Sequence, residues 1–431
     1  MMKNIEIIQY AQDVLLKAGA EKVQCSLKKS EKHELNVAAG EINLFRTTFN
    51  TNLSLTGILK NKKGSITINT LDKKSVDEAA KQVIELAESS KPDEANDISE
   101  KQPAKEFSSG PQKPDIDKMY SRLKEFMKYS KEAYPNTILE GIHYDFTVSN
   151  SFFVNSNEVK FNSNKGLYEV VVMFTTKEGK KTSSFNYVVY LSKDLEKPIK
   201  DCGSIDRLLK QSSEQLETFS IPEKFVGNVI ITPECMDDII ESVTGFLGDY
   251  PLITGVSVYK NKLDKKIADT KLTLHSKPLS EVFASNYYVT YDGYEARNST
   301  IIDKGVLKTF LLGLYGSRKT GLPKAVNQGS CYIIDSGDTS FDEIIKSTKK
   351  GVLLCRFSGG NPSDNGDFSG VAKNSYYIEN GEIKYPISET MINGNIVEMM
   401  ENIKQISSER INSGYHIYPW IKFDGLTVSG K

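Results

Sequence analysis

Residue types that build metal centres and disulfide frameworks are scarce in this sequence. Its five cysteines are scattered, odd in number and form no Cys-x-x-Cys pair. This pattern argues against a disulfide framework or a structural zinc site, and it is typical of reduced thiols in a cytoplasmic protein. The four histidines lie more than a hundred residues apart from one another, so no pair close in sequence can hold a metal ion.

The sequence also lacks an excess of charge of one sign and a long apolar run. Its 55 basic and 56 acidic residues give a net charge of −1, which provides no electrostatic basis for binding nucleic acid or an anionic membrane. No apolar stretch approaches the length that crosses a bilayer. Near the N-terminus, Ile5, Ile8, Ala11 and Leu15 recur at helical spacing between polar residues, which predicts an amphipathic helix and not a signal peptide.

What is present is the composition of a globular protein with several domains. Hydrophobic residues make up 39% and charged residues 26% of the chain, and 431 residues are too many for one ordinary core. We therefore expect an α+β protein of three consecutive parts joined by one linker. The parts are an N-terminal α+β domain (1–90), a linker (91–115), a middle α+β domain (116–220) and a C-terminal domain with a curved, mostly antiparallel sheet (221–431).

The first two domains are each expected to place helices against antiparallel strands. In the N-terminal domain, β-prone runs precede a charged helix over 75–89; the runs lie at 22–27, 33–38, 52–59 and 65–69, the last two joined by a turn over 61–64. The segment 91–115 contains four prolines and few apolar side chains, so it is predicted to be a linker. In the middle domain, a β pattern over 138–191 precedes a helix near 204–216.

The C-terminal domain begins with a short apolar strand and then a helix signal. Thr232 can cap this helix, and Pro233 suits its first position. Apolar residues then recur on one face of the predicted helix: Met236, Ile239, Ile240, Val243, Phe246 and Leu247.

An ordered set of short motifs follows this helix. The set lies at 305–312, 315–319, 357–360, 366–370, 377–383, 392–395 and 426–430. Each motif alone is only a turn or hairpin signal; Asn380-Gly381, for example, favours a type I′ turn. In this order and spacing, over about 200 residues, the set resembles the TldD/PmbA metallopeptidase family, whose members are also labelled modulators of DNA gyrase.

The resemblance includes the helix that carries zinc in the catalytic members. There the helix reads HExxxH, with two zinc ligands and a general-base glutamate, and a third ligand comes from a cysteine close to the C-terminus. Here Glu241 and Phe246 stand in place of the histidines, and Ser242 in place of the glutamate. No cysteine lies beyond Cys355, and the segment 411–420 takes the place of the cysteine loop. Because catalytic zinc needs three protein ligands and an open position, the resemblance implies no zinc in this chain.

The resemblance therefore points to the non-catalytic PmbA branch, also called TldE. It implies a subunit of a heteromeric metallopeptidase in which zinc is held only by a TldD-type partner. Unfolded peptides would be cleaved or matured in a closed cavity, with this chain forming half of the wall. It also implies a homodimer when the chain is alone. Whether the isolated chain is an enzyme stays open.

The residues leave other functions open as well. Cys235, in the first turn of the predicted helix, and Cys355, beside Arg356, are candidate nucleophiles of an autonomous thiol hydrolase. A chaperone-like protein that holds unfolded peptide without a catalytic partner is a second alternative. A metal site assembled from distant residues is a third, with Cys355, Asp367, Glu241 or His416 as ligands.

Two further segments are candidates for binding. The glycine-rich stretch after the predicted strand at 352–357 lets another backbone approach closely. Its peptide-cavity candidates are Ser358, Gly359, Gly360, Gly366 and Asp367. An aromatic run is either a subunit or peptide contact or a strand with partly exposed rings; it contains Tyr287, Tyr288, Tyr291 and Tyr294.

Overall fold

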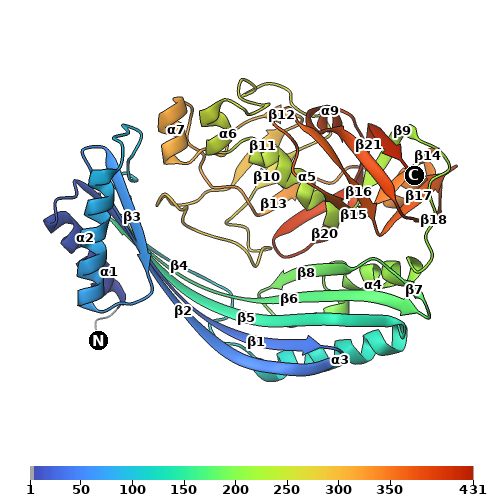
Figure 1. Ribbon diagram of the computed structural model, residues 1–431, viewed down its shortest axis with the longest axis horizontal. Coiled ribbons are helices and arrows are strands. Elements are labelled where there is room, and N and C mark those ends of the chain that lie inside the picture. The colour runs from blue at the N-terminus through green and yellow to red at the C-terminus, as the bar shows by residue number, and fades with distance from the viewer. Residues whose placement is uncertain (1–3, 431) are drawn as a thin grey trace.

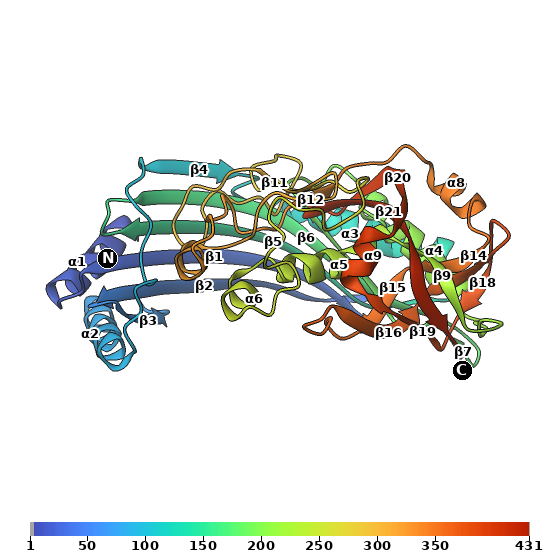
Figure 2. The ribbon, with the colours of Figure 1, turned by 90° about the horizontal axis from the view of Figure 1, so that it is seen from above.

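The computed structural model describes residues 4–430 as a mixed α+β protein built around two β-sheets (Figure 1). A long, curved sheet lies along one side of the molecule, and the second sheet lies above it with the C-terminal half of the chain. Helices α1 (Asn4–Lys17) and α2 (Lys73–Ser89) cover one end of the long sheet, while the C-terminus lies at the opposite end of the molecule (Figure 2). The α+β class expected from the sequence is confirmed.

The long sheet takes all its strands from the first 192 residues. They are β1 (Lys22–Ala38), β2 (Glu41–Leu59), β3 (Lys62–Ile68), β4 (Lys105–Ser109), β5 (Thr137–Asn155), β6 (Lys160–Glu178), β7 (Lys181–Thr182) and β8 (Asn186–Ser192). The order is β3-β2-β1-β5-β6-β4, with β7 and β8 also paired to β6, and only β4 runs parallel to its neighbour. Strands β2, β5 and β6 have 19 residues each, and a strand of that length spans on the order of 60 Å.

Two separate hydrophobic cores share these long strands. Val23, Cys25 and Leu27 of β1 are buried in the core under α1 and α2, and Leu35 and Val37 are buried in a second core. The second core lies against α3 (Ile116–Ala133) and α4 (Ile205–Glu214). Between the two cores the side chains of β1 are mostly half-exposed, but its backbone stays paired on both sides. The two β-prone runs predicted at 22–27 and 33–38 are therefore one strand.

This sheet bears on the expected division of the chain. Strands from 1–90 pair with strands from 116–220 through β1 and β5, so the two proposed domains share one sheet. The segment 91–115 is also ordered: it contributes β4, and Asp93 and Asp97 pair with Lys319 and Arg318. These two ion pairs attach the segment to α7 (Leu314–Thr320). The boundaries themselves stay a proposal.

The second sheet takes its strands from residues 225–429. They are β9 (Phe225–Ile231), β10 (Leu274–Ser276), β11 (Ser299–Asp303), β12 (Val306–Leu307), β13 (Tyr332–Ile334), β14 (Lys350–Leu354), β15 (Arg356–Gly359), β16 (Asp367–Lys373), β17 (Ser375–Glu379), β18 (Glu382–Ile387), β19 (Thr390–Asn395), β20 (Ile403–Asn412) and β21 (His416–Ser429). Only two pairs in it are parallel, β9 with β14 and β13 with β21, as expected for a mostly antiparallel sheet.

Five short helices accompany this sheet: α5 (Pro233–Gly245), α6 (Asp249–Thr254), α7 (Leu314–Thr320), α8 (Phe341–Lys346) and α9 (Ile396–Glu401). Helix α5 begins at Pro233 as predicted, with Thr232 in the capping position. The Thr232 side chain makes no capping hydrogen bond, and its hydroxyl donates instead to the Cys355 carbonyl at 3.5 Å. The apolar face of α5 packs into the main core of the C-terminal half through Met236, Ile240 and Val243.

The turn predictions have different outcomes. Asn380 and Gly381 join β17 to β18 with φ of 53° and 76°, the positive pair that a type I′ turn requires. The turn predicted at 61–64 is wrong by two residues: Lys60 and Asn61 have positive φ, and β3 already begins at Lys62. Within residues 4–430, the structure has no helix that is long and apolar enough to cross a membrane.

Candidate functional site

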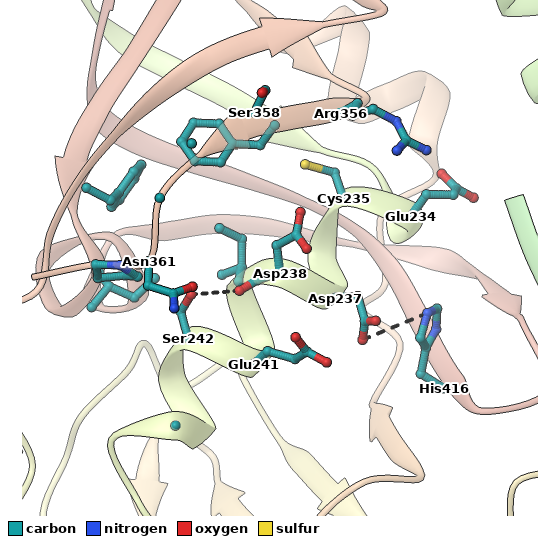
Figure 3. Close-up of a pocket in the computed structure, with 18 of the residues that line it drawn as sticks. Glu234, Cys235, Asp237, Asp238, Glu241, Ser242, Arg356, Ser358, Asn361 and His416 are labelled. Carbon is teal, nitrogen blue, oxygen red and sulfur yellow. Dashed lines mark hydrogen bonds and ion pairs between the residues drawn. The ribbon is translucent and has the colours of Figure 1, made fainter. Parts of the chain in front are cut away.

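A cavity of about 1080 Å³ lies beside α5, and its walls come from several separate parts of the chain. The exposed face of α5 forms one wall, and the stretch 355–362 at and after β15 lies across from it (Figure 3). Residues near β8 and the turn before β21 also line the cavity, together with residues at the start of α4 and around α6. The fold thus brings α5, the glycine-rich stretch and the segment around His416 to one place.

The three positions that the sequence resemblance aligns with the zinc motif all line this cavity, but they do not form a set of metal ligands. Ser242 donates its hydroxyl hydrogen to the Asp238 carbonyl at 2.7 Å, within its own helix. The Phe246 ring packs edge-on against Tyr259 at 6.2 Å between centroids and has no donor atom. Glu241 is the only one of the three whose side chain is both exposed and charged.

The residues around the cavity do not fit a zinc ion. Among residues 4–430 no group of three or more His, Cys, Asp and Glu side chains is arranged to hold a metal. Of the four distant ligands proposed from the sequence, Cys355, Glu241 and His416 line the cavity and Asp367 does not, but the described residues form no group that could hold a metal. A catalytic zinc needs three protein ligands, so no reaction step is assigned to a metal in this chain.

The glycine-rich candidates divide into two groups. Ser358, Gly359 and Gly360 line the cavity, whereas Gly366 and Asp367 do not. The Asp367 carboxylate accepts hydrogen bonds from Asn395 at 2.9 Å and Asn365 at 2.8 Å. These two positions therefore stabilise the turn into β16 and do not contribute to the cavity surface.

Four acidic residues of α5 line the cavity, and only Glu241 was singled out from the sequence. Glu234, Asp237, Asp238 and Glu241 recur at positions i, i+3, i+4 and i+7, so they lie along one face of the helix. This spacing was visible in the sequence as the polar counterpart of the apolar stripe. It is the signal that would have identified them.

Glu234 is paired with a cation through Oε1, whereas its Oε2 is buried without a hydrogen-bond partner in the described structure. The Arg207 guanidinium donates to its carboxylate at 2.5 Å, and the Ser204 hydroxyl donates to the same oxygen. Burial opposes ionisation of Glu234, but Arg207 and Ser204 together hold its pKa below the ordinary value. The Arg207 guanidinium also lies over the Trp420 ring at 5.2 Å. Glu234 therefore ties α5 to α4 and to β21.

Asp237 has no cationic partner among the described residues. Its Oδ1 accepts a hydrogen bond from the Tyr418 hydroxyl at 3.3 Å and lies 4.0 Å from Nε2 of His416. Burial, with the nearby Glu241 and Asp238 carboxylates, raises the pKa of Asp237 to about 7. Burial also raises the pKa of Asp238, where Arg356 opposes the shift.

His416 contacts the same carboxylate from β21. Its residue is 4% exposed, and its ring stacks on Tyr418 at 4.2 Å. Burial lowers the pKa of His416 to about 3, so the ring is neutral at physiological pH. Its Nδ1 is buried without a hydrogen-bond partner in the described structure, and its Nε2 is too far from Asp237 for a hydrogen bond.

The candidate thiol nucleophiles also line the cavity, but they are poorly suited to the role. Cys235 is buried, and burial with the neighbouring Asp238 raises its pKa well above the ordinary value. Burial raises the pKa of Cys355 to about 12. Arg356 does not activate Cys355, because its guanidinium donates to Asn186 at 3.1 Å and to the Tyr187 carbonyl at 2.8 Å. A thiol without thiolate character is a weak nucleophile.

The aromatic run lies away from this cavity and forms a contact within the chain. It is a loop and not a strand. Tyr288 stacks on Phe107 with ring centroids 4.8 Å apart and donates a hydrogen bond to the Ser108 carbonyl. Tyr294 donates a hydrogen bond to Glu100. The run therefore joins the C-terminal half to the segment 91–115.

Comparisons with known proteins identify relatives of the C-terminal half of the chain. Residues 225–430 match the family described as the PmbA/TldA metallopeptidase C-terminal domain. Metalloprotease PmbA of Escherichia coli O157:H7 is 29% identical over 51% of this chain and 49% of its own length. A zinc metalloprotease TldD homolog of Saccharolobus solfataricus is 29% identical over 46% of this chain and 47% of its own. The matches thus span about half of these relatives.

Solved structures match over the whole fold. TldE from Thermococcus kodakarensis aligns with a TM-score of 0.83 at 18% identity, covering 99% of each chain. A Bacteroides thetaiotaomicron protein assigned to the modulators of DNA gyrase aligns with a TM-score of 0.87 at 22% identity, covering 100% of each chain. At these identities the likeness establishes the fold. Because the sequence match covers α5, the glycine-rich stretch and β21, the C-terminal half of the chain is identified as a PmbA/TldD-type metallopeptidase C-terminal domain.

Proposed function

We propose that this chain is a non-catalytic, PmbA/TldE-like subunit of a heteromeric TldD-type metallopeptidase that acts in the proteolysis or maturation of unfolded peptides. The observation that carries the proposal is the cavity beside α5. It surrounds the positions of the zinc motif, but Glu241, Ser242 and Phe246 fill them. A cavity of about 1080 Å³ is large enough for several residues of a peptide.

In this proposal the zinc and the general base belong to a TldD-type partner in the cytoplasm. This chain contributes cavity wall and stabilises the catalytic subunit, and without the partner it forms a homodimer. The glycine-rich wall at Ser358, Gly359 and Gly360 supports a peptide role. A substituent at Gly360 would meet nothing within 4 Å, so a peptide backbone can approach closely there.

The thiol-hydrolase alternative is disfavoured by the buried, protonated state of Cys235 and Cys355. A chaperone-like function uses the same cavity and differs from the proposal only in needing no catalytic partner. Mixing the purified chain with a TldD-type chain from the same cell separates these functions. A peptidase subunit gives a stable heteromer in sedimentation and peptide cleavage that neither chain shows alone.

The source of that cleavage can be assigned by substitution. Changing the HExxxH glutamate of the partner to glutamine is expected to abolish cleavage, because that residue activates the attacking water. Changing Cys235 or Cys355 of this chain to serine is expected to leave it intact. Cleavage that survives the first change and disappears with the second would contradict the proposal.

A further inference from the structure

The acidic face of α5 contains two carboxyl groups that the fold leaves without a cation. Glu234 is paired with Arg207, and Asp238 lies on the side of α5 that faces the Arg356–Asn361 wall (Figure 3). Asp237 and Glu241 lie on the other side, toward His416. Neither forms an ion pair with a lysine or arginine among the described residues. Two carboxylates one turn apart repel each other unless a positive charge lies between them.

The second observation is the His416 ring, which is unpartnered and points at the same carboxylate. Its Nε2 lies 4.0 Å from Oδ1 of Asp237, a gap that no protein donor fills. Its Nδ1 is buried without a partner, although the residue is only 4% exposed. Buried polar atoms are normally hydrogen-bonded. Nε2 faces Asp237 without a hydrogen bond and therefore indicates room for a ligand between them, whereas Nδ1 points away from that carboxylate.

The chemistry of the three groups selects the ligand. Two carboxylates and a neutral imidazole offer several acceptors and no positive charge. A protonated primary amine carries three N–H donors and one positive charge, so it can bond all three groups and relieve the repulsion between the carboxylates. Tyr415 also lines the cavity, and its ring, with a centroid 4.3 Å from that of His416, adds aromatic surface that attracts a cation.

We propose that Asp237, Glu241 and His416 bind the protonated primary amine of a peptide, either the N-terminal α-amine or a lysine side chain. The proposal rests on the proposed function only in that the ligand is a peptide. The amine fixes one end of the peptide on α5, and the chain then extends along the glycine-rich wall.

The test is calorimetric titration of the isolated chain with three short peptides of otherwise equal sequence. One has a free N-terminus and no lysine, the second is N-acetylated without lysine, and the third is N-acetylated with one lysine. We expect one of the two amine-bearing peptides to bind at least about tenfold more tightly than the second peptide. Preference for the first assigns the α-amine, and preference for the third assigns lysine. Equal binding of all three, or no binding of any, would overturn the proposal.

Variants locate the preference. Asp237→Asn and Glu241→Gln each remove one charge with little change in shape and are expected to reduce the amine preference about tenfold. His416→Phe tests the third group. Glu85→Gln on α2, an exposed residue far from α5, is the matched control and is expected to leave the preference unchanged. Full preference in both acidic variants would contradict the assignment. The titration uses the isolated chain without a TldD-type partner. Its result therefore does not depend on whether the two chains form a heteromer, and the mixing experiment does not depend on the titration.

Discussion

Glu234 and Asp237 lie one turn apart on α5, and they differ in whether a cation lies beside the carboxylate. Glu234 is held by Arg207 and Ser204. Asp237 faces Glu241 and the His416 ring and has no cation beside it. The pKa of the first carboxyl is lowered and that of the second is raised. A buried carboxylate with a cation beside it supports the fold, whereas a carboxylate without a cation beside a cavity is available for a ligand.

The same contrast recurs on the opposite wall. A substituent at Gly359 would meet the Phe357 ring at 2.6 Å and the Ser369 carbonyl at 2.7 Å. A substituent at Gly360 would meet nothing within 4 Å. Each wall of the cavity therefore has one closed position and one open position, one helical turn apart on α5 and adjacent in the glycine-rich stretch. Substitutions at these positions test whether the closed and open positions differ in their effect on stability.

The largest effect is expected at the Glu234 pair. Arg207→Met leaves the Glu234 carboxylate in its buried place without its cation, and we expect a loss of about 3 kcal/mol in the free energy of unfolding. The double variant Arg207→Met/Glu234→Met is expected to recover most of this loss, because no unpaired charge remains. Urea denaturation measures both. A single variant as stable as the wild type would show that the pair does not support the fold.

A smaller effect, of opposite dependence on pH, is expected at Asp237. Its pKa of about 7 lies above the unfolded value of an aspartate, so the folded state binds the proton more tightly. The wild type should therefore lose stability as pH rises from about 4 to about 7. Asp237→Asn removes this loss and is expected to be more stable than the wild type by about 2 kcal/mol at pH 8.

Glu234 provides the matched control for that measurement. Its lowered pKa contributes stability above the unfolded value, and this stability is lost as pH falls. Thermal unfolding of Asp237→Asn and Glu234→Gln at pH 5 and pH 8 should therefore show changes of opposite sign at pH 8. If Asp237→Asn is less stable than the wild type at pH 8, the unpaired state of Asp237 is wrong.

A still smaller effect is expected at the glycines. Gly359→Ala places its methyl group against Phe357 and the backbone of β16, and we expect a loss of about 1 kcal/mol. Gly360→Ala is expected to leave stability unchanged, because its methyl group points into open space. Urea denaturation of the two variants compares adjacent positions in one wall. Equal losses at both would contradict the open position.

The smallest effect is expected at the thiols. All five cysteines are free and buried. We expect the native chain to react with iodoacetamide at pH 7.5 on the order of a hundredfold more slowly than a free thiol. In urea all five should react. Rapid labelling of Cys235 or Cys355 in the native chain would restore the thiol-hydrolase alternative.

The sequence predicted the fold class and the helices α1, α2, α4 and α5. In α1 and α5 the apolar residues recur at helical spacing, which is a strong signal. The sequence did not predict that 22–27 and 33–38 belong to one strand. Between them the side chains of β1 lie between two cores and are polar, so the apolar alternation stops while the backbone pairing continues. Pairing partners such as β5 are far away in sequence and leave no local signal.

The site could be predicted only in part, because the sequence shows local patterns but not contacts between distant elements. The position of α5 and the loss of the zinc motif at Glu241, Ser242 and Phe246 follow from the sequence alone. The acidic residues of α5 also recur at helical spacing, but a reading based on apolar residues alone does not find them. The contacts of Arg207 with Glu234 and of His416 with Asp237 join residues from different elements. Only the tertiary structure distinguishes the paired carboxyl from the unpaired one.

The most direct test of the central claim is to measure zinc content and peptide cleavage on one sample of the isolated chain, and to repeat both measurements after adding a TldD-type partner. We expect no stoichiometric zinc and no cleavage by the chain alone, and zinc-dependent cleavage in the mixture. Stoichiometric zinc with cleavage by the chain alone would contradict this expectation, because residues other than Glu241 and Phe246 would then have to hold the metal.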